Sequence, residues 1–86
     1  MEFEFDPKKS DENKRKHSID FVEAQALWED PDRLEVQAKT QKEKRFVLTG
    51  RIAGNHWSAV FTPRADRTRI ISVRRARKQE VEEYES

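Results

Sequence analysis

The sequence contains no cysteine, and glycine, proline and aromatic residues are scarce, at two, three and eight of 86 residues. Without cysteine there is no disulfide framework and no thiolate metal site. The two histidines, His17 and His56, lie far apart in the chain, so they lack the close spacing of a structural zinc site. We therefore expect neither a metal nor a cofactor.

Long hydrophobic runs are missing as well. No apolar segment approaches the length that spans a membrane, and the first residues show no basic region followed by an apolar stretch. The apolar fraction is 34% and the charged fraction is 41%, so any core is small. We expect one small domain over residues 1–86, located in the cytoplasm and without a membrane partner.

Charge is unevenly distributed along the chain, although its sum is only +1. Residues 1–43 carry eight Lys/Arg and twelve Asp/Glu, whereas residues 44–86 carry ten and five, which gives net charges of −4 and +5. This division predicts a polarised surface whose C-terminal half attracts anions.

The N-terminal half predicts a short strand and two helices. Phe3 and Phe5 alternate with acidic residues, as in an edge strand with one apolar face. Asp6 followed by Pro7 is typical of a helix start, although the ten residues that follow contain no large apolar side chain. Three patterns before Pro31 indicate a second helix. Asp20 and Glu23 form a capping box, and Ile19 and Ala24 form a hydrophobic staple. An apolar stripe follows, made of Phe21, Ala24, Leu27 and Trp28.

Three strands and a final helix are expected in the C-terminal half, after a connection over 32–43 with room for a short strand. The strands cover about 45–51, 57–62 and 68–75, and the helix covers 76–85. Short turns between the strands predict an antiparallel sheet in an α+β domain of order β-α-α-β-β-β-α, with the helices packed on one face. The expected core consists of Phe21, Leu27, Trp28, Val47, Phe61 and Ile71.

The segment from Arg64 to Lys78 is the strongest functional signal, because seven of its 15 residues are cationic and only Asp66 is anionic. Its centre has the β-branched composition of a strand. Strict alternation would bury Ile71 and Val73 and direct Arg74 to the open face, where its planar guanidinium could bind a phosphate. The competing interpretation is a surface arginine paired with a glutamate of the last helix.

Other cations and acid–base groups accompany Arg74. Arg64 and Arg67 flank the turn into its strand, where they either bind flanking phosphates or remain solvated loop charges. Arg75, Arg77 and Lys78 lie where sheet and last helix meet, and we expect one of them to pair with Glu80 or Glu82.

The first helix and the last offer further candidates. His17 could act as general acid or base, with Lys9, Asn13 and Lys16 on the same helix face; the alternative is a structural polar stripe, with His17 bonded to a backbone carbonyl. Tyr84 either stacks on a base or donates a proton, or it anchors the last helix beside Val81. Trp28 and Trp57 are expected in the core, and His56 in an exposed loop.

These residues by themselves leave three functions open. A ribonuclease would use arginines to stabilise the charge on a phosphorane formed by 2′-OH attack, with a proton donor and acceptor nearby and no metal. A non-catalytic nucleic-acid-binding module would need only the basic strand and would bind with strong salt dependence. A protein-interaction domain would present its arginines to an acidic partner.

Two separated motifs resemble the BrnT family of toxins. The first comprises Phe3-Glu-Phe-Asp-x-x-Lys9, Asn13-x-x-Lys16-His17 and Phe21-x-Glu23-Ala24, and the second comprises Arg69-Ile-Ile-Ser-x-Arg74-x-Ala76 and Glu80-x-x-x-Tyr84. The resemblance covers about residues 3–84. Lys44 stands where members of the family often have an acidic residue.

The resemblance implies a RelE-like fold and a metal-independent endoribonuclease that inhibits translation and growth. It also implies an RNA substrate and a BrnA-type antitoxin, a ribbon-helix-helix protein that binds operator DNA within the complex. For a ribonuclease, the residue arguments above favour catalytic roles for Arg74, His17, Arg64 and Tyr84, and RNA-binding roles for Lys9, Lys16, Arg67, Arg75, Arg77 and Lys78.

Overall fold

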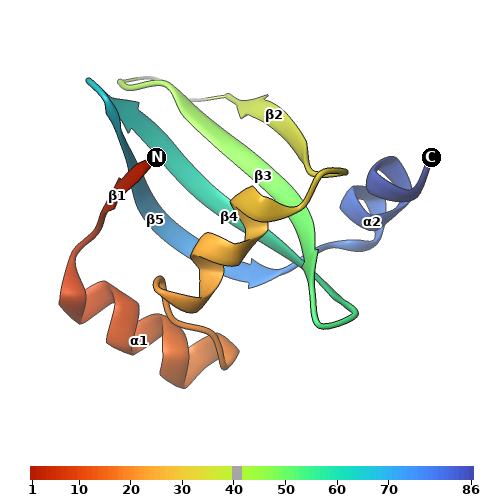
Figure 1. Ribbon diagram of the computed structural model, residues 1–86, viewed down its shortest axis with the longest axis horizontal. Coiled ribbons are helices and arrows are strands. Elements are labelled where there is room, and N and C mark those ends of the chain that lie inside the picture. Colours follow the sequence, from red (N-terminus) through yellow and green to blue (C-terminus); the bar gives the residue numbers. More distant parts are fainter. Residues whose placement is uncertain (40–41) are drawn as a thin grey trace.

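The computed structural model describes residues 1–39 and 42–86, which form one five-stranded mixed sheet, two α-helices and a 3₁₀ helix (Figure 1). In chain order the elements are β1 (Glu2–Glu4), α1 (Pro7–His17), the 3₁₀ helix η1 (Glu23–Glu29), β2 (Leu34–Ala38), β3 (Arg45–Ile52), β4 (Asn55–Arg64), β5 (Arg67–Arg75) and α2 (Lys78–Glu85). The strand order is β1-β5-β4-β3-β2, with β1 parallel to β5 and every other neighbouring pair antiparallel.

The α+β class is confirmed, with three differences from the expected order. The sheet is mixed, because β1 joins β5 in parallel, and a period of two in a strand gives no information on the direction of its neighbour. The connection after Pro31 contains a complete strand, β2, paired with β3 over five residues. The second helix is a 3₁₀ helix, although the reciprocal bonds of its predicted capping box are present, from Glu23 N–H to Asp20 Oδ1 (2.7 Å) and from Asp20 N–H to Glu23 Oε1 (3.0 Å).

Polar anchors hold α1 against the edge of β5. The helix begins as expected, with the Asp6 carboxylate accepting a hydrogen bond from the Lys8 N–H (2.9 Å). Its buried residues are Ser10 and Asn13. The Asn13 amide donates to the carbonyl of Val73 (2.8 Å) and accepts from the Val73 N–H (3.1 Å), as a neighbouring strand would. A helix without an apolar face is thereby fixed to the sheet.

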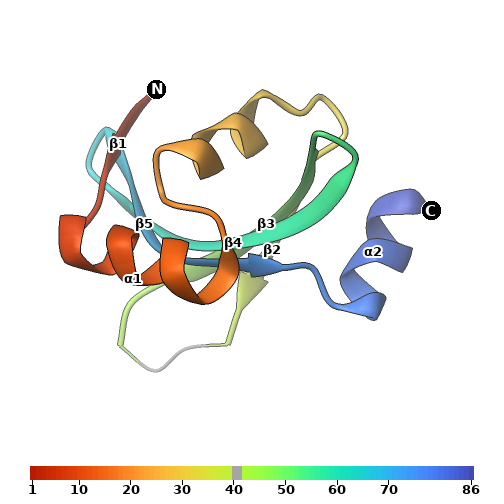
Figure 2. The same ribbon diagram turned by 90° about the horizontal axis from the view of Figure 1, so that it is seen from below.

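One face of the sheet holds the core, and η1 covers it, as Figure 2 shows. Trp28 of η1 lies edge-on to both Phe3 and Phe61, with ring centroids 5.0 and 5.3 Å apart. Phe21, Leu27 and Phe61 are buried as expected, and Trp28 is partly buried against them. The prediction that Val47 and Ile71 belong to the core was wrong, because both are only half-buried. The other buried apolar residues are Ile19, Ala24, Leu48, Trp57, Ala59, Ile70 and Val73.

The last helix, α2, lies on the other side of the sheet, so the helices do not share one face as expected. Its Glu80 is bonded to Ser58 and Arg74, whose side chains alternate with the core residues Ala59 and Val73. None of its described residues is buried. Among residues 1–39 and 42–86, no helix is long and apolar enough to cross a membrane.

Candidate nucleic-acid interface

The side of the sheet opposite η1, here called the open face, is the part of the structure that presents arginines in a row. Pairing and alternation place Arg67, Arg69 and Arg74 of β5 on this face, with Arg64 of β4 opposite Arg67. Aliphatic residues occupy the other half of the open face and form what we call the aliphatic strip: Leu34, Val36, Ala38, Val47 and Val60. None of these five is buried.

A β-bulge in β5 determines which side chains reach the open face. Val60 pairs with Ser72 and Phe61 with Ile70, so Ile71 has no partner on β4. The extra residue reverses the alternation, and Ile70 and Val73 are therefore both buried, at 2% and 0% exposure. The expectation that Ile71 and Val73 both lie on the core face was wrong for Ile71 and right for Val73. Arg74 lies on the open face, as expected.

Arg74 is the centre of a hydrogen-bonded cluster beneath α2. Its Nη1 and Nη2 donate to Glu80 Oε1 (2.7 Å) and Oε2 (2.9 Å), which makes a bidentate pair. Glu80 Oε1 also accepts from the hydroxyl of Ser58 (2.9 Å) and from the N–H of Arg77 (2.8 Å). The Ser58 hydroxyl lies 2.8 Å from that of Thr49. Strands β4 and β5 and helix α2 thus meet at one carboxylate, and Ser58 connects it to Thr49 of β3.

The charges of this pair stabilise each other. The hydrogen bond from Arg74 is the largest cause that lowers the pKa of Glu80, from 4.5 to about 2, against an opposing effect of burial. The same bond raises the pKa of Arg74 above its ordinary value. Glu80 therefore remains ionised at neutral pH, which makes it a poor proton acceptor and a strong holder of the guanidinium.

Arg74 keeps donors available despite this pairing. A guanidinium has five N–H donors, and Arg74 uses three of them, two on Glu80 and one on the carbonyl of Arg75 (3.3 Å). Its side chain is 23% exposed. The pairing with a glutamate of the last helix is thus present, and two N–H groups remain for a further ligand. One of Arg75, Arg77 and Lys78 was expected to pair with Glu80 or Glu82, and that was wrong, since Glu80 forms its ion pair with Arg74.

The neighbouring cations Arg75, Arg77 and Lys78 are exposed. The Arg75 guanidinium lies 5.1 Å from the centre of the Trp57 ring, in cation–π contact on the core side of the sheet. Trp57 itself is buried, as expected. These three cations extend the positive charge from Arg74 around the end of the sheet.

Arg64 and Arg67 lie at the far end of the open face. Arg67 and Arg74 are seven positions apart on β5, which is roughly 20 Å at the usual rise of a strand. Arg67 is 3.8 Å from Glu2, and Arg69 donates to Glu4 over 2.9 Å. One phosphodiester cannot reach both ends, so Arg64 and Arg74 do not belong to one catalytic centre.

The predicted residues of α1 are exposed along the edge of β5. Lys9, Lys16 and His17 are all exposed, and the His17 side chain makes no hydrogen bond with any described residue, so its proposed bond to a backbone carbonyl is not observed. Asn13, which was expected on their face, is instead buried against Val73. Because Val73 precedes Arg74, the last turn of α1 lies beside the C-terminal end of β5.

Tyr84 is an anchor of α2. Its hydroxyl donates to Asp30 Oδ2 over 2.7 Å, and this bond is the largest cause that raises the pKa of Tyr84 to about 12. A phenol with so high a pKa is a weak proton donor near neutrality. His56 was expected in an exposed loop, which was wrong: it belongs to β4, lies edge-on to Tyr84 at 5.3 Å, and places Nε2 2.7 Å from Glu85 Oε2.

One end of the sheet therefore groups the last turn of α1 with Arg74, Arg75, Arg77 and Lys78. Arg64 and Arg67 lie at the other end of the open face, and the hydroxyl of Tyr84 is bonded to Asp30. Sequence reasoning missed Ser58 and the orientation of Glu80. The spacing from Arg74 to Glu80 crosses a strand end and a helix start, so no periodic pattern could reveal their contact. No group of three potential metal ligands occurs in the part of the chain that the structure describes.

Comparison with known protein families gives one match. The family model described as "Ribonuclease toxin, BrnT, of type II toxin-antitoxin system" matches residues 5–80. A search of curated proteins finds no match. The matched range includes α1, the whole sheet beyond β1, and Glu80 of α2.

Proposed function

The chain belongs to the BrnT family of ribonuclease toxins of type II toxin–antitoxin systems, and on that premise we propose that it cleaves RNA without a metal ion, using Arg74 at the phosphate. The observation that carries the proposal is a guanidinium on the open face beside α2, oriented by Glu80, 23% exposed and left with two N–H donors. We also propose that the fold is RelE-like, which the antiparallel strands β3 to β5 and the helix α1 that precedes them support.

The chemistry requires three things of the protein. The 2′-OH attacks the adjacent phosphorus after losing its proton, a phosphorane with additional negative charge forms, and the leaving 5′ oxygen receives a proton. Arg74 supplies the second requirement, because a cation already held in place by Glu80 needs no reorganisation when the charge develops. Glu80 is thus a positioning residue.

We assign one of the two proton transfers to His17, as general acid or general base, and the other to water. It is the exposed last residue of α1, the helix that Asn13 bonds to Val73 of β5, and its side chain makes no hydrogen bond with a described residue. Lys16, Arg75, Arg77 and Lys78 would bind flanking phosphates on either side of Arg74. Lys9, Arg64 and Arg67 lie further along the edge and the open face, where they would contact more distant nucleotides.

An antitoxin partner follows from the family, and we propose that it is a BrnA-type protein. Its ribbon-helix-helix part would bind operator DNA, so that the toxin contacts DNA only through the complex. We expect the pair to act in the cytoplasm, where cleavage of RNA inhibits translation and growth. Covering of the arginine row would account for neutralisation.

The role of Arg74 can be separated from its contribution to stability by a matched pair of variants. Arg74→Ala and Glu80→Gln remove the same ion pair, but only the first removes the guanidinium. Each purified protein, freed of antitoxin, is incubated with RNA and EDTA, and its melting temperature is recorded. We expect Arg74→Ala to lose about 10²–10³-fold in rate, as for the loss of one oxyanion donor, and Glu80→Gln to lose far less.

Arg74→Lys should recover only part of the rate, because an ammonium cannot reproduce the planar fork. Equal losses of rate for Arg74→Ala and Glu80→Gln, in proportion to their losses of melting temperature, would assign Arg74 a structural role only. Cleavage that appears only with added Mg²⁺ would refute metal independence.

A non-catalytic nucleic-acid-binding module remains a second candidate, because the arginines of β5 extend over roughly 20 Å, the length of several nucleotides. Such a module would bind RNA with an affinity that falls steeply with salt and would leave it intact. Intact RNA after prolonged incubation with folded, antitoxin-free protein would favour this candidate.

A further inference from the structure

Strand β2 leaves one edge of the sheet unpaired. It pairs with β3 over Leu34–Ala38, and the strand order ends there. Within residues 1–39 and 42–86, no hydrogen bond is made to the outer side of this strand. The strand contains neither lysine nor proline, the residues that commonly protect an exposed edge from pairing. Its backbone is therefore available to an added strand.

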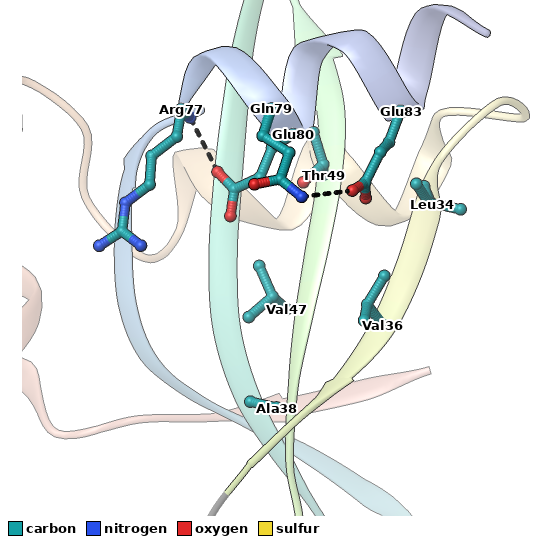
Figure 3. A pocket seen from close by; sticks show the side chains of 9 residues that line it. All are labelled: Leu34, Val36, Ala38, Val47, Thr49, Arg77, Gln79, Glu80 and Glu83. Carbon is teal, nitrogen blue, oxygen red and sulfur yellow. Dashed lines mark hydrogen bonds between the residues drawn. The ribbon is translucent and has the colours of Figure 1, made fainter.

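The aliphatic strip lies directly beside this edge. Figure 3 shows Leu34, Val36 and Val47 beneath α2, where they line a groove of about 240 Å³ together with the polar side chains of that helix. Val36 is 49% exposed, and only Met1 and Val22 are more exposed among the large hydrophobic residues described. An added strand would continue the strip and cover Val36.

The charge around β2 selects the kind of strand. Residues 33–45 carry five cations and two acidic residues, a net charge of +3, with cations on both sides of the strand at Arg33, Lys39, Lys42, Lys44 and Arg45. A segment with negative charge would be attracted to this edge. A second copy of the chain would bring two such edges together, each with a net charge of +3, and would be repelled.

We propose that the edge of β2 and the aliphatic strip are the docking site for an extended, net acidic segment of the antitoxin, which adds a sixth strand to the sheet. This inference rests on the proposed function, because it requires a toxin that a partner neutralises. Main-chain bonds to Leu34–Ala38 would give affinity, and aliphatic side chains at every second position would lie on the open face beside Val36. Aliphatic side chains of the segment would enter the groove under α2, which Glu80 and Glu83 also line, and its acidic residues would lie outside the groove beside the cations that flank β2.

The test compares two exposed valines on different elements. Val36→Asp places a negative charge on the proposed site, and Val22→Asp places the same charge before η1. Affinity for the purified cognate antitoxin is measured for both variants, with RNA cleavage and melting temperature alongside. We expect Val36→Asp to bind at least tenfold more weakly while still cleaving RNA, and Val22→Asp to match the parent in both assays.

Hydrogen exchange on the unmodified complex gives a second measurement that does not depend on any variant. The amides of 34–38 should become protected when the antitoxin binds. Exchange as fast in the complex as in the free toxin, or equal affinities of the two variants, overturns the proposal.

Two further outcomes assign the site to another occupant. A toxin dimer that Val36→Asp dissociates would show that a second copy occupies the edge. Loss of RNA cleavage with antitoxin binding intact would show that RNA occupies the strip. If the parent protein itself cleaves no RNA, the proposed function fails, whereas affinity and exchange still report on the docking site.

Discussion

Replacement of Asn13 by alanine should destabilise the domain far more than its place on a polar helix suggests. The Asn13 amide donates to the carbonyls of Ile19 and Val73, both over 2.8 Å, and accepts from the Val73 N–H over 3.1 Å. Asn13 is only 7% exposed. Alanine would remove all three bonds and leave their buried backbone partners unpaired.

The magnitude follows from these bonds. Each is worth about 1 kcal/mol, and buried groups that lose their partner cost additional free energy, so we expect a loss of about 3–4 kcal/mol. In a domain of this size, 1 kcal/mol lowers the melting temperature by about 4–8 °C, so the expected decrease is at least about 12 °C. Differential scanning calorimetry or circular dichroism would measure it.

Two further variants make the test specific. Asn13→Asp retains an acceptor for the Val73 N–H but directs a carboxylate oxygen toward two carbonyls, so it should be more harmful than alanine. Glu12→Ala, at an exposed position of the same helix, should change the stability by less than about 0.5 kcal/mol. A melting temperature of Asn13→Ala within a few degrees of the parent would refute the anchoring role.

Three other outcomes are expected. Tyr84→Phe removes the bond to Asp30, so the amides of α2 should exchange faster with solvent while the global melting temperature falls less, and unchanged exchange would contradict the anchor. Because the pKa of Glu80 is lowered to about 2, ionised Glu80 stabilises the folded protein fully above pH 4.5, and this contribution is lost as the pH falls toward 2. Urea titrations at several pH values should show this decrease in the free energy of unfolding, and Glu80→Gln should not show it. His17→Ala should leave the melting temperature unchanged, and a loss of cleavage rate whose size varies with pH would support proton transfer, whereas a parental rate at every pH would exclude it.

Sequence reasoning succeeded where local rules decide the structure. The cap at Asp6, the reciprocal bonds of Asp20 with Glu23 and the strands β3 to β5 all follow from patterns within a few residues. It failed where distant segments meet. Neither the parallel pairing of β1 nor the bonds of Asn13 to Val73 has a local signature, because each joins segments about 60 residues apart or more.

The candidate site shows the same division. The arginines of β5 could be recognised from composition, but their partners Glu2, Glu4 and Glu80 come from both ends of the chain. The facing of Ile70 and Ile71 depends on one unpaired residue, which alternation cannot locate.

The bulge at Ile71 determines which changes in the length of β5 leave the arginines on the open face. Deletion of Ile71 would restore strict alternation and leave Val73 toward the core and Arg74 on the open face, because the residues on either side of the bulge already pair with consecutive residues of β4. The same deletion at a paired position, with the bulge kept, would turn every later side chain of the strand to the other face. Composition, charge and strand propensity would hardly change. When relatives are aligned, a one-residue gap at Ile71 therefore keeps Arg74 on the open face, whereas a one-residue gap at a paired position of β5 signals that the later arginines lie on the opposite face.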